Sequence, residues 1–403
     1  MRRAESLPVS TDAMSIYRRA YQLLKTIGPL RKLVRALREV LGRYRVPAWY
    51  LDGSLRADGI RISTVFAGPL ESKNYFAHLL FVDNSTERFL GTNWVWNVLR
   101  NGVRLGSDLV ITHELSDTRP RRGSSGYCVP CWIGTEADVS RAVDLCRKSE
   151  NIKSDLRRSK RSRMTYDITR DPQTIADFYN AMYLPYVHRV HGNRTMSTPW
   201  EELEPELDRS ELMLLERDGE AIAGNLMVDL GNQRMRARAL GVKDGDPQYV
   251  KQGALAALYH YEVDYLSRRG YEKIHYGASR PFLKDGALGF KKKYGARIVD
   301  RDTRVFRIRV LRYSMGVKSF LRNNPFISES NGHYYANFFI ERSTDIDGPN
   351  LQSDIDRYGI AGTAAVRVYD LENASGPLDV DPRPAEPTFV EICRSDASFT
   401  STT

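Results

Sequence analysis

The amino-acid sequence predicts an α+β fold with mixed, mostly antiparallel sheets flanked by helices. Between residues 165 and 315 the chain runs helix, antiparallel meander, helix, strand, helix and strand, an order typical of this class. Two tight-turn dipeptides, Asp218-Gly219 and Gly231-Asn232, separate the β-like runs of the meander. The length of 403 residues exceeds what one ordinary core needs, so we expect two domains and an extension.

Residues 1–45 form the first predicted unit, a basic amphipathic helical segment. Between residues 12 and 43, apolar side chains repeat at helical spacing on both sides of Gly28-Pro29, and arginines and lysines occupy the opposite faces. Such a segment either docks on the body of its own protein or lies on an anionic membrane surface. The N-terminus is positively charged, but no apolar core follows, so we expect no secretory leader.

Residues 46–150 predict a mixed α/β domain without a catalytic motif. Its expected elements are β-like runs at 60–68, 75–83, 108–115 and 127–133 and a helix near 93–101. Cys128 and Cys131 form a lone CxxC in the last run, without further ligands at zinc-site spacing. We therefore expect structural cysteines in a reducing cytoplasm, and no metal site.

A helical linker is expected at 136–163. It ends in a basic run, 153–163, in which six of eleven residues are Lys or Arg. A run of this kind is either a solvated helix face or a surface for phosphate or RNA.

The region from 165 to 315 is the richest in signals. We expect a strand at 165–169, a helix from Pro172 to about Arg189, strands at 212–216, 221–230 and 234–242, a helix at 249–269, a strand at 273–277, a helix at 286–294 and a strand pair at 297–311. Gly270 is a stop signal for the long helix.

The last predicted unit, 316–403, is an acidic extension with β-like runs and a disordered tail. Five arginines and twelve acidic residues between 341 and 403 give this part a charge of −7. The whole chain has a charge of +10, so the first 340 residues carry +17. A basic body favours an anionic partner such as a phosphate-bearing cofactor, a nucleic acid or a membrane surface.

One stretch, HYGASRPFLKDGALGFKKKYGA at 275–296, places many charges among glycines at a strand-to-helix turn. Its pattern is Tyr276-Gly277, then Asp285-Gly286, then Phe290-Lys291, then Tyr294-Gly295. Gly277 at a strand end permits close approach of a ligand or another backbone.

This stretch, with the element order of 165–315, resembles the GNAT acyltransferases, and more narrowly the FemAB-type and related envelope and exopolysaccharide acyltransferases. The resemblance implies tandem GNAT-like lobes. Residues 46–150 would form a degenerate N-terminal lobe and residues 151–315 the catalytic lobe. It covers about 150 residues well, the N-terminal half weakly and residues 316–403 not at all.

The resemblance also implies roles for residues of the stretch. Lys291 would face the reaction centre and stabilise the oxyanion of acyl transfer, whereas Lys292 and Lys293 point elsewhere on the helix. Arg280 and Ser279 are expected to bind the substrate, Arg280 through a phosphate or carboxylate. A salt bridge from Arg280 to Asp285 is the structural alternative.

Proton transfer requires a base, for which the sequence offers several candidates. They are Asp285, Tyr276, Glu216 and the pair His188 and His191. In the resembling family the segment after the first helix borders the acceptor pocket, so His191 and Arg194 are further candidates for substrate contact. A solvated helix end is the alternative for these two.

The cofactor segment departs from the GNAT pattern. Acetyltransferases of that fold cradle the CoA pyrophosphate with a Q/R-x-x-G-x-G/A loop, and residues 245–254 do not match its spacing. Lys251, Gln252 and Gly253 are the residues there that are expected to meet a phosphate at a helix start. Acyl-CoA, acyl carrier protein and aminoacyl-tRNA all stay open as donors.

The sequence thus predicts an N- or O-acyltransferase that modifies an amine or hydroxyl of an envelope precursor, polysaccharide or small metabolite. It would use acyl-CoA as co-substrate without a tightly bound cofactor, in the cytoplasm or at the inner face of the membrane. Two alternatives are an aminoacyl-tRNA-dependent transferase and a non-catalytic nucleic-acid or membrane-binding protein on a decayed acyltransferase fold.

Overall fold

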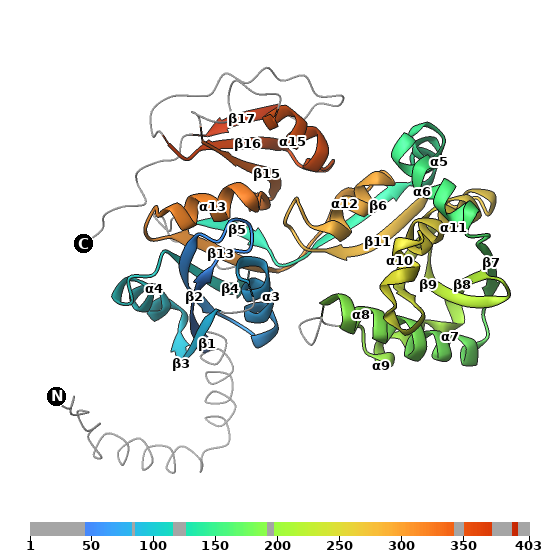
Figure 1. The fold of residues 1–403 in the computed structure, drawn as a ribbon, viewed down its shortest axis with the longest axis horizontal. Coiled ribbons are helices and arrows are strands. Elements are labelled where there is room, and N and C mark those ends of the chain that lie inside the picture. The colour runs from blue at the N-terminus through green and yellow to red at the C-terminus, as the bar shows by residue number, and fades with distance from the viewer. Residues whose placement is uncertain are drawn as a thin grey trace, which may run out of the picture.

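The computed structural model describes residues 45–82, 85–115, 126–191, 197–341, 350–372 and 389–393, and its strands form three sheets (Figure 1). The segment predicted at 12–43 and the tail beyond residue 393 lie outside these ranges. In Figure 1 the first and third sheets occupy one end of the molecule and the second sheet the other, with β6 and β11 running between the two ends.

The first sheet has six strands in the order β3-β1-β2-β4-β13-β5. These strands and the helices that cover them are β1 (Arg45–Ser54), β2 (Arg61–Ala67), β3 (Thr86–Trp94), β4 (Leu109–Leu115), β5 (Tyr127–Pro130), β13 (Arg304–Val310), α3 (Leu70–Leu80), α4 (Val95–Arg104) and α13 (Met315–Asn323). Side chains of β2 alternate between the faces: Phe66 packs with α3 and α13, and Val65 packs with α4. Both faces are therefore covered and apolar.

The second sheet has seven strands in the order β12-β6-β11-β10-β9-β8-β7. They are β6 (Ile133–Asp138), β7 (Thr165–Thr169), β8 (Ser210–Arg217), β9 (Glu220–Gly231), β10 (Arg234–Val242), β11 (Lys273–Ser279) and β12 (Arg297–Arg301). The helical segments around it are α5 (Val139–Lys148), α6 (Glu150–Arg161), α7 (Pro172–Phe178), the π-helix η1 (Tyr179–Tyr183), α8 (Leu184–His191), α9 (Trp200–Leu203), η3 (Glu204–Arg209), η4 (Lys243–Gly245), α10 (Pro247–Lys251), α11 (Ala254–Arg268) and α12 (Gly286–Lys293).

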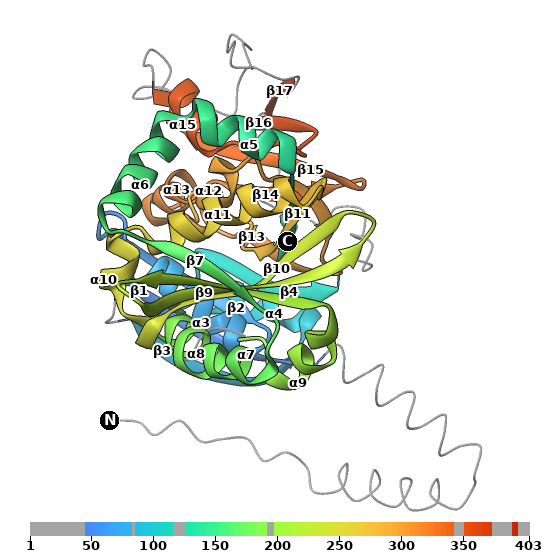
Figure 2. The same cartoon turned by 90° about the vertical axis from the view of Figure 1, so that its right-hand side faces the viewer.

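The helices divide between the two faces of this sheet. Figure 2 shows α5, α6 and α11 on one side of it and α7, α8 and α9 on the other. Met213 and Met227 pack into the core under α11, whereas Leu212 and Leu226, their chain neighbours, pack into the core under α7 and η1. Successive residues of one strand thus fill two separate cores.

The two large sheets exchange strands. β6 comes from the predicted N-terminal lobe but lies in the second sheet between β12 and β11, and β13 comes from the predicted C-terminal lobe but lies in the first sheet. A cut at residue 150 therefore does not separate the sheets, and the division into 46–150 and 151–315 stays a prediction.

A third sheet, in the order β14-β15-β16-β17, occupies the predicted extension 316–403. Its elements are β14 (Phe326–Ser330), β15 (His333–Ile340), α15 (Asn350–Tyr358), β16 (Ala365–Asp370) and β17 (Phe389–Cys393). Phe326 and Phe339 of this sheet both pack against the ring of Tyr127 in β5. The extension is therefore joined to the first sheet through aromatic contacts.

The structure confirms the α+β class and most of the predicted elements, and it corrects several of them. The helical linker expected at 136–163 begins in the strand β6 and continues as two helices, α5 and α6, because Ser149 between them has an extended backbone. Residues 75–83 are not a strand, because Phe76 and Leu80 turn to one buried side of the helix α3. The helix predicted at 249–269 is divided at Gly253, whose φ of 95° breaks the helical path. The strands β12 and β13 do not pair with each other, because each joins a different sheet.

Gly241 is a point of close backbone contact between β10 and η1. A Cβ at this position would lie 2.5 Å from the carbonyl oxygen of Met182, which belongs to the backbone and cannot turn away. We expect Gly241→Ala to lower the free energy of unfolding by about 1–3 kcal/mol in urea titrations. Gly289→Ala is the control, since a Cβ there meets no atom within 4 Å. Equal effects of the two substitutions would contradict this contact.

Candidate functional site

The pairing of β10 with β11 stops early, so that no ladder joins the two strands beyond it. Three residue pairs are parallel partners, the last being Arg236 with His275. Beyond these pairs, β10 stays paired with β9 and β11 stays paired with β6, and each of these two ladders contains a bulge. Gly277, with φ of 72°, lies at the bulge of β11, and a Cβ there would be 3.6 Å from the Ala237 carbonyl oxygen. On β11, side chains bond the backbone of Gly277, whose N–H donates to Nδ1 of His275 and whose carbonyl oxygen accepts from Oγ1 of Thr135. We call the edges Ala237–Val242 and Tyr276–Ser279 the β10–β11 opening.

Lys291 holds the end of β11 at this opening. Its Nζ donates hydrogen bonds of 2.9 Å to the carbonyl oxygen of Ala278 and 2.9 Å to Oγ of Ser279. The side chain is buried, and this burial lowers the pKa of the Lys291 ammonium to about 8, although the charge of Asp285 opposes the shift. An ammonium has three donors, so one N–H is left for a further acceptor.

Tyr276 lies in the core on the α11 side of the sheet, together with two polar side chains that sequence reasoning missed. Glu262 of α11 and Asn225 of β9 are both fully buried. Within the described residues, the hydroxyl of Tyr276, both carboxyl oxygens of Glu262 and both amide atoms of Asn225 have no hydrogen-bond partner. Burial raises the pKa of Tyr276 well above its usual value, and the charge of Glu262 adds to this, so its phenol stays protonated and can donate a hydrogen bond.

Burial likewise raises the pKa of Glu262 to about 8, while Asn225 beside it opposes the shift. At neutral pH this carboxyl group is therefore mostly protonated. A polar residue at an interior helical position, such as Glu262 in YHYEVDYL, is the only signal that could have suggested it.

Arg280 lies where the chain passes between the two ends of the molecule. Its guanidinium carbon is 4.0 Å from the ring centre of Tyr75 and 3.7 Å from that of Trp132, so the cation is stacked between two aromatic rings. Its Nη1 donates to the carbonyl oxygen of Cys131 at 3.3 Å. Among the described residues no carboxylate forms an ion pair with Arg280, so the expected alternative, a bridge to Asp285, is not found.

Asp285 and Glu216 have structural positions. Oδ1 of Asp285 accepts from the backbone N–H of Leu288 at 2.9 Å and caps the N-terminus of α12. Glu216 lies at the end of β8, paired with Thr165 and Ala221. The role of either carboxylate as a base stays a prediction.

The residues expected to meet a phosphate are engaged within the chain. The backbone N–H groups of Gln252 and Gly253 donate to the carbonyl oxygens of Gln248 and Val250. The side-chain oxygen of Gln252 accepts from Arg217, and the carbonyl oxygen of Gly253 accepts from Ser159 at 3.3 Å. Lys251 is exposed. The segment therefore lacks the free backbone donors at 252–253 that a phosphate loop would use.

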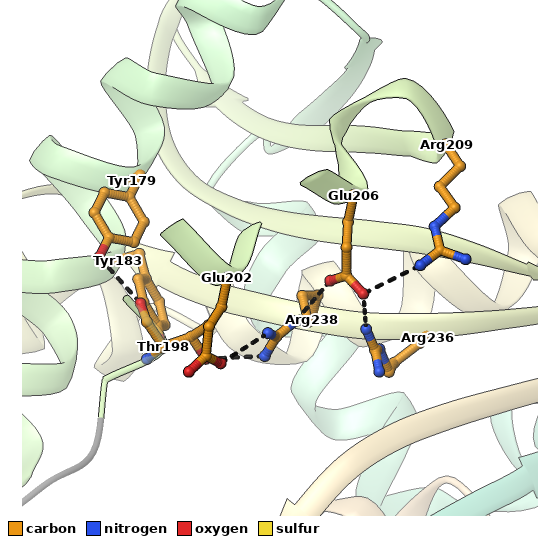
Figure 3. Close-up of polar contacts among 8 residues, drawn as sticks. All are labelled: Tyr179, Tyr183, Thr198, Glu202, Glu206, Arg209, Arg236 and Arg238. Carbon is orange, nitrogen blue, oxygen red and sulfur yellow. Dashed lines mark hydrogen bonds and ion pairs between the residues drawn. The ribbon is translucent and has the colours of Figure 1, made fainter. Parts of the chain in front are cut away.

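The opposite face of β10 carries an arginine network that sequence reasoning also missed (Figure 3). Glu206 of η3 accepts hydrogen bonds from Arg236 and, at 2.9 Å, from Nε of Arg238. Arg238 also donates to Oγ1 of Thr198 at 2.9 Å. Burial alone would raise the pKa of Glu206, but the hydrogen bond from Arg238 and the charge of Arg236 outweigh it and lower the pKa. The alternating arginines of RMRAR at 234–238 were the available signal.

This network fixes segment 197–209 over β10. We expect Glu206→Gln to lower the free energy of unfolding by about 2 kcal/mol, because Arg209, Arg236 and Arg238 lose their charged acceptor. Glu204→Gln is the matched control, since Glu204 lies in the same short helix but is exposed. Chemical denaturation of both variants measures the difference, and equal stabilities would show that the network adds nothing.

His188 lies exposed near the end of α8. The side chain of His191 and the whole of Arg194 are outside the described residues. Within the described ranges no group of three or more His, Cys, Asp or Glu side chains is arranged to hold a metal ion. Among the described residues, no helix is both long enough and apolar enough to cross a bilayer.

Two surface cavities lie away from the β10–β11 opening. Their volumes are about 350 and 300 Å³, and both are lined by Arg56 and His78 in the first sheet's region. Arg56 donates to the carbonyl oxygens of His78 and Phe81 at the C-terminus of α3. This arginine therefore has a structural role as a helix cap.

No protein-family model and no curated protein sequence matches the chain. Solved structures to which it is similar include FemX (TM-score 0.35, 10% identity, 64% of this chain and 83% of that chain) and L-PGS from Bacillus licheniformis (0.33, 12%, 64% and 82%). A GCN5-related N-acetyltransferase from Sphaerobacter thermophilus is similar over 62% of this chain and 73% of that chain (0.30, 12%). These names fall within the acyltransferase group that the sequence resembles.

Proposed function

We propose that this chain is a GNAT-type acyltransferase whose acyl donor lies in the β10–β11 opening. The observation that carries the proposal is the parallel ladder that stops after three residue pairs. Backbone N–H and C=O groups on a strand edge seek partners, and an extended donor arm that contains amide groups supplies them as an added strand would. An acyl group on a pantetheine thioester is a donor of this kind.

The acceptor amine or hydroxyl attacks the thioester carbonyl, and the tetrahedral oxyanion then expels the thiol. Lys291 stands at the end of β11 with one N–H unused by Ala278 and Ser279, and we assign it to the oxyanion. Tyr276, which stays protonated, donates a hydrogen bond to the leaving sulfur. Arg280, stacked but without a carboxylate, takes an anionic group of the acceptor.

The free thiols of Cys128, Cys131 and Cys146 agree with a reducing cytoplasm, where thioester donors are made. The proposed acceptor is an amine or hydroxyl of an envelope precursor, polysaccharide or small metabolite. The arginine network of Arg236 and Arg238 lies on the acceptor side of β10 in this proposal.

A thiol-release assay with acetyl-pantetheine, acetyl-CoA and longer acyl thioesters, each with a panel of amines and hydroxyl compounds, tests this function. We expect acceptor-dependent release that Gly277→Val abolishes, because a branched side chain at φ of 72° strains the bulge and enters the opening. Gly286→Ala, where a Cβ meets no atom within 4 Å, should keep the rate. Release from no thioester, in protein that is folded by circular dichroism, would refute the proposal.

A further inference from the structure

The helix α6 presents a row of positive charges, most of which have no ion-pair partner within the described residues. Ile152 and Ser159 are buried on its inner side. The outer side exposes Arg157, Arg158, Lys160 and Arg161, and Arg163 follows. Of these, Arg157 alone has an ion pair within the described residues, at 3.8 Å from Glu150. We call Arg157–Arg163 the α6 basic surface.

This surface lies beside the start of α11 and the end of α12, the helix that carries Lys291. Ser159 donates to the carbonyl oxygen of Gly253, the residue before α11. On the other side, Nζ of Lys293 is 3.5 Å from a carboxylate oxygen of Asp155 in α6, and Lys293 is two residues from Lys291. In Figure 2 α6 leads along one side of the molecule towards α10. A partner bound on α6 is therefore next to the proposed site of acyl transfer.

A small diphosphate gains little from this surface. The backbone donors of Gln252 and Gly253 are already used within α10 and its end, so these two residues offer a diphosphate no N–H group. Exposed arginines on a helix form weak individual ion pairs with a small ion, because water competes and the side chains lose freedom. Many such charges act together when the partner is a protein with a large anionic surface. They then also speed the association of that partner with α6.

The composition of α6 favours a protein over a nucleic acid as that partner. Proteins that bind single-stranded nucleic acid interleave basic and aromatic side chains, and α6 contains no aromatic residue.

We infer that the acyl donor is presented by an acidic carrier protein that docks on the α6 basic surface and extends its pantetheine arm into the β10–β11 opening. This inference rests on the proposed function. The acceptor N–H or O–H adds to the thioester carbonyl, the C–S bond breaks, and the carrier thiol leaves with the proton.

Fluorescence anisotropy with a labelled acetylated acyl carrier protein tests the docking, using the full chain. We expect saturable binding that weakens as salt rises and at least a tenfold loss of affinity in Arg158→Glu/Arg161→Glu. The matched control is Arg100→Glu/Arg104→Glu, which reverses two exposed arginines of the helix α4 and should stay within twofold of the wild type. Thermal unfolding of both variants checks that they fold.

Two results would overturn the inference: no binding of the carrier protein, whether or not tRNA binds α6 instead, or equal losses of affinity in both variants. Wild-type turnover of acetyl-pantetheine, which needs no docking, separates the two proposals. If that small thioester is used but the carrier protein does not bind, the docking fails and the acyltransferase stands. If neither is used, the proposed function fails as well.

Discussion

The wild-type protein is expected to lose stability relative to Glu262→Gln as the pH rises from about 4.5 to about 8. The pKa of Glu262 is raised to about 8 in the folded chain by burial, against an ordinary value of 4.5. The folded state therefore keeps a proton that the unfolded state releases. Its stabilising effect is complete below pH 4.5 and is lost as the pH rises through 8, by roughly 1.4 kcal/mol per pH unit.

Glu262→Gln removes this titration but keeps the shape of the side chain. At pH 8 and above the variant should be more stable than the wild type by on the order of 4 kcal/mol, since the wild type then buries a charge without a partner. The neighbours of Glu262 are Tyr259, Tyr276 and Asn225. Among the described residues, no positively charged group beside them compensates the carboxylate.

Urea titrations at pH 5, 6, 7 and 8 measure the difference between the two proteins. Glu272→Gln, which changes an exposed carboxylate, is the control and should follow the wild-type curve. If the unfolding free energies of Glu262→Gln and the wild type change in parallel with pH, the carboxylate of Glu262 has a stabilising partner in the folded chain.

Lys291→Met is expected to lower the rate of acyl transfer about 100-fold, the usual cost of removing one donor to an oxyanion. Because burial lowers the pKa of Lys291 to about 8, its ammonium is charged at pH 7 and is lost as the pH rises through 8. The wild-type rate should therefore fall above pH 8. Lys291→Arg keeps the charge, so that variant should recover part of the rate without this fall.

Lys292 is the matched control for this prediction. Burial lowers its pKa to about 8 as well, but its Nζ donates to the carbonyl oxygen of Asp356, next to the third sheet, at 2.7 Å. Lys292→Met should keep the rate within a few-fold and the alkaline fall unchanged. A Lys291→Met protein that melts earlier but transfers the acyl group at the wild-type rate would show that Lys291 only holds β11.

The local pattern of the sequence was sufficient for the meander β8-β9-β10. Asp218-Gly219 forms the first turn at positive φ angles, as predicted. The second turn is Asn232-Gln233, one residue after the predicted Gly231-Asn232, because Gly231 still pairs with Arg234. The strand predicted from the apolar run at 75–83 is wrong, because a short apolar run does not distinguish a buried strand from a helix. Its neighbours decided the outcome, since α3 fills the core between the first sheet and α13.

The functional residues divide in the same way. The stretch 275–296 directed attention to Lys291, Ser279 and Arg280, and the structure brings Lys291 and Ser279 into contact at the end of β11. The cap that Asp285 forms with Leu288, three residues along the chain, could have been predicted from an Asp directly before a helix. The stretch gave no sign that Arg280 is stacked between Tyr75 and Trp132. Such partners come from distant parts of the chain, so no local pattern encodes them.

By itself, the sequence determined the α+β class, the turns of the meander and the uneven charge, because these depend on neighbours within a few residues. Only the tertiary structure decided that β6 and β13 exchange between sheets, that the β10–β11 ladder ends after three pairs, and that Glu262 is buried beside Asn225 without a hydrogen bond. Strand partners and burial arise from contacts between residues far apart in the chain, and these are fixed only when the sheets and helices pack together.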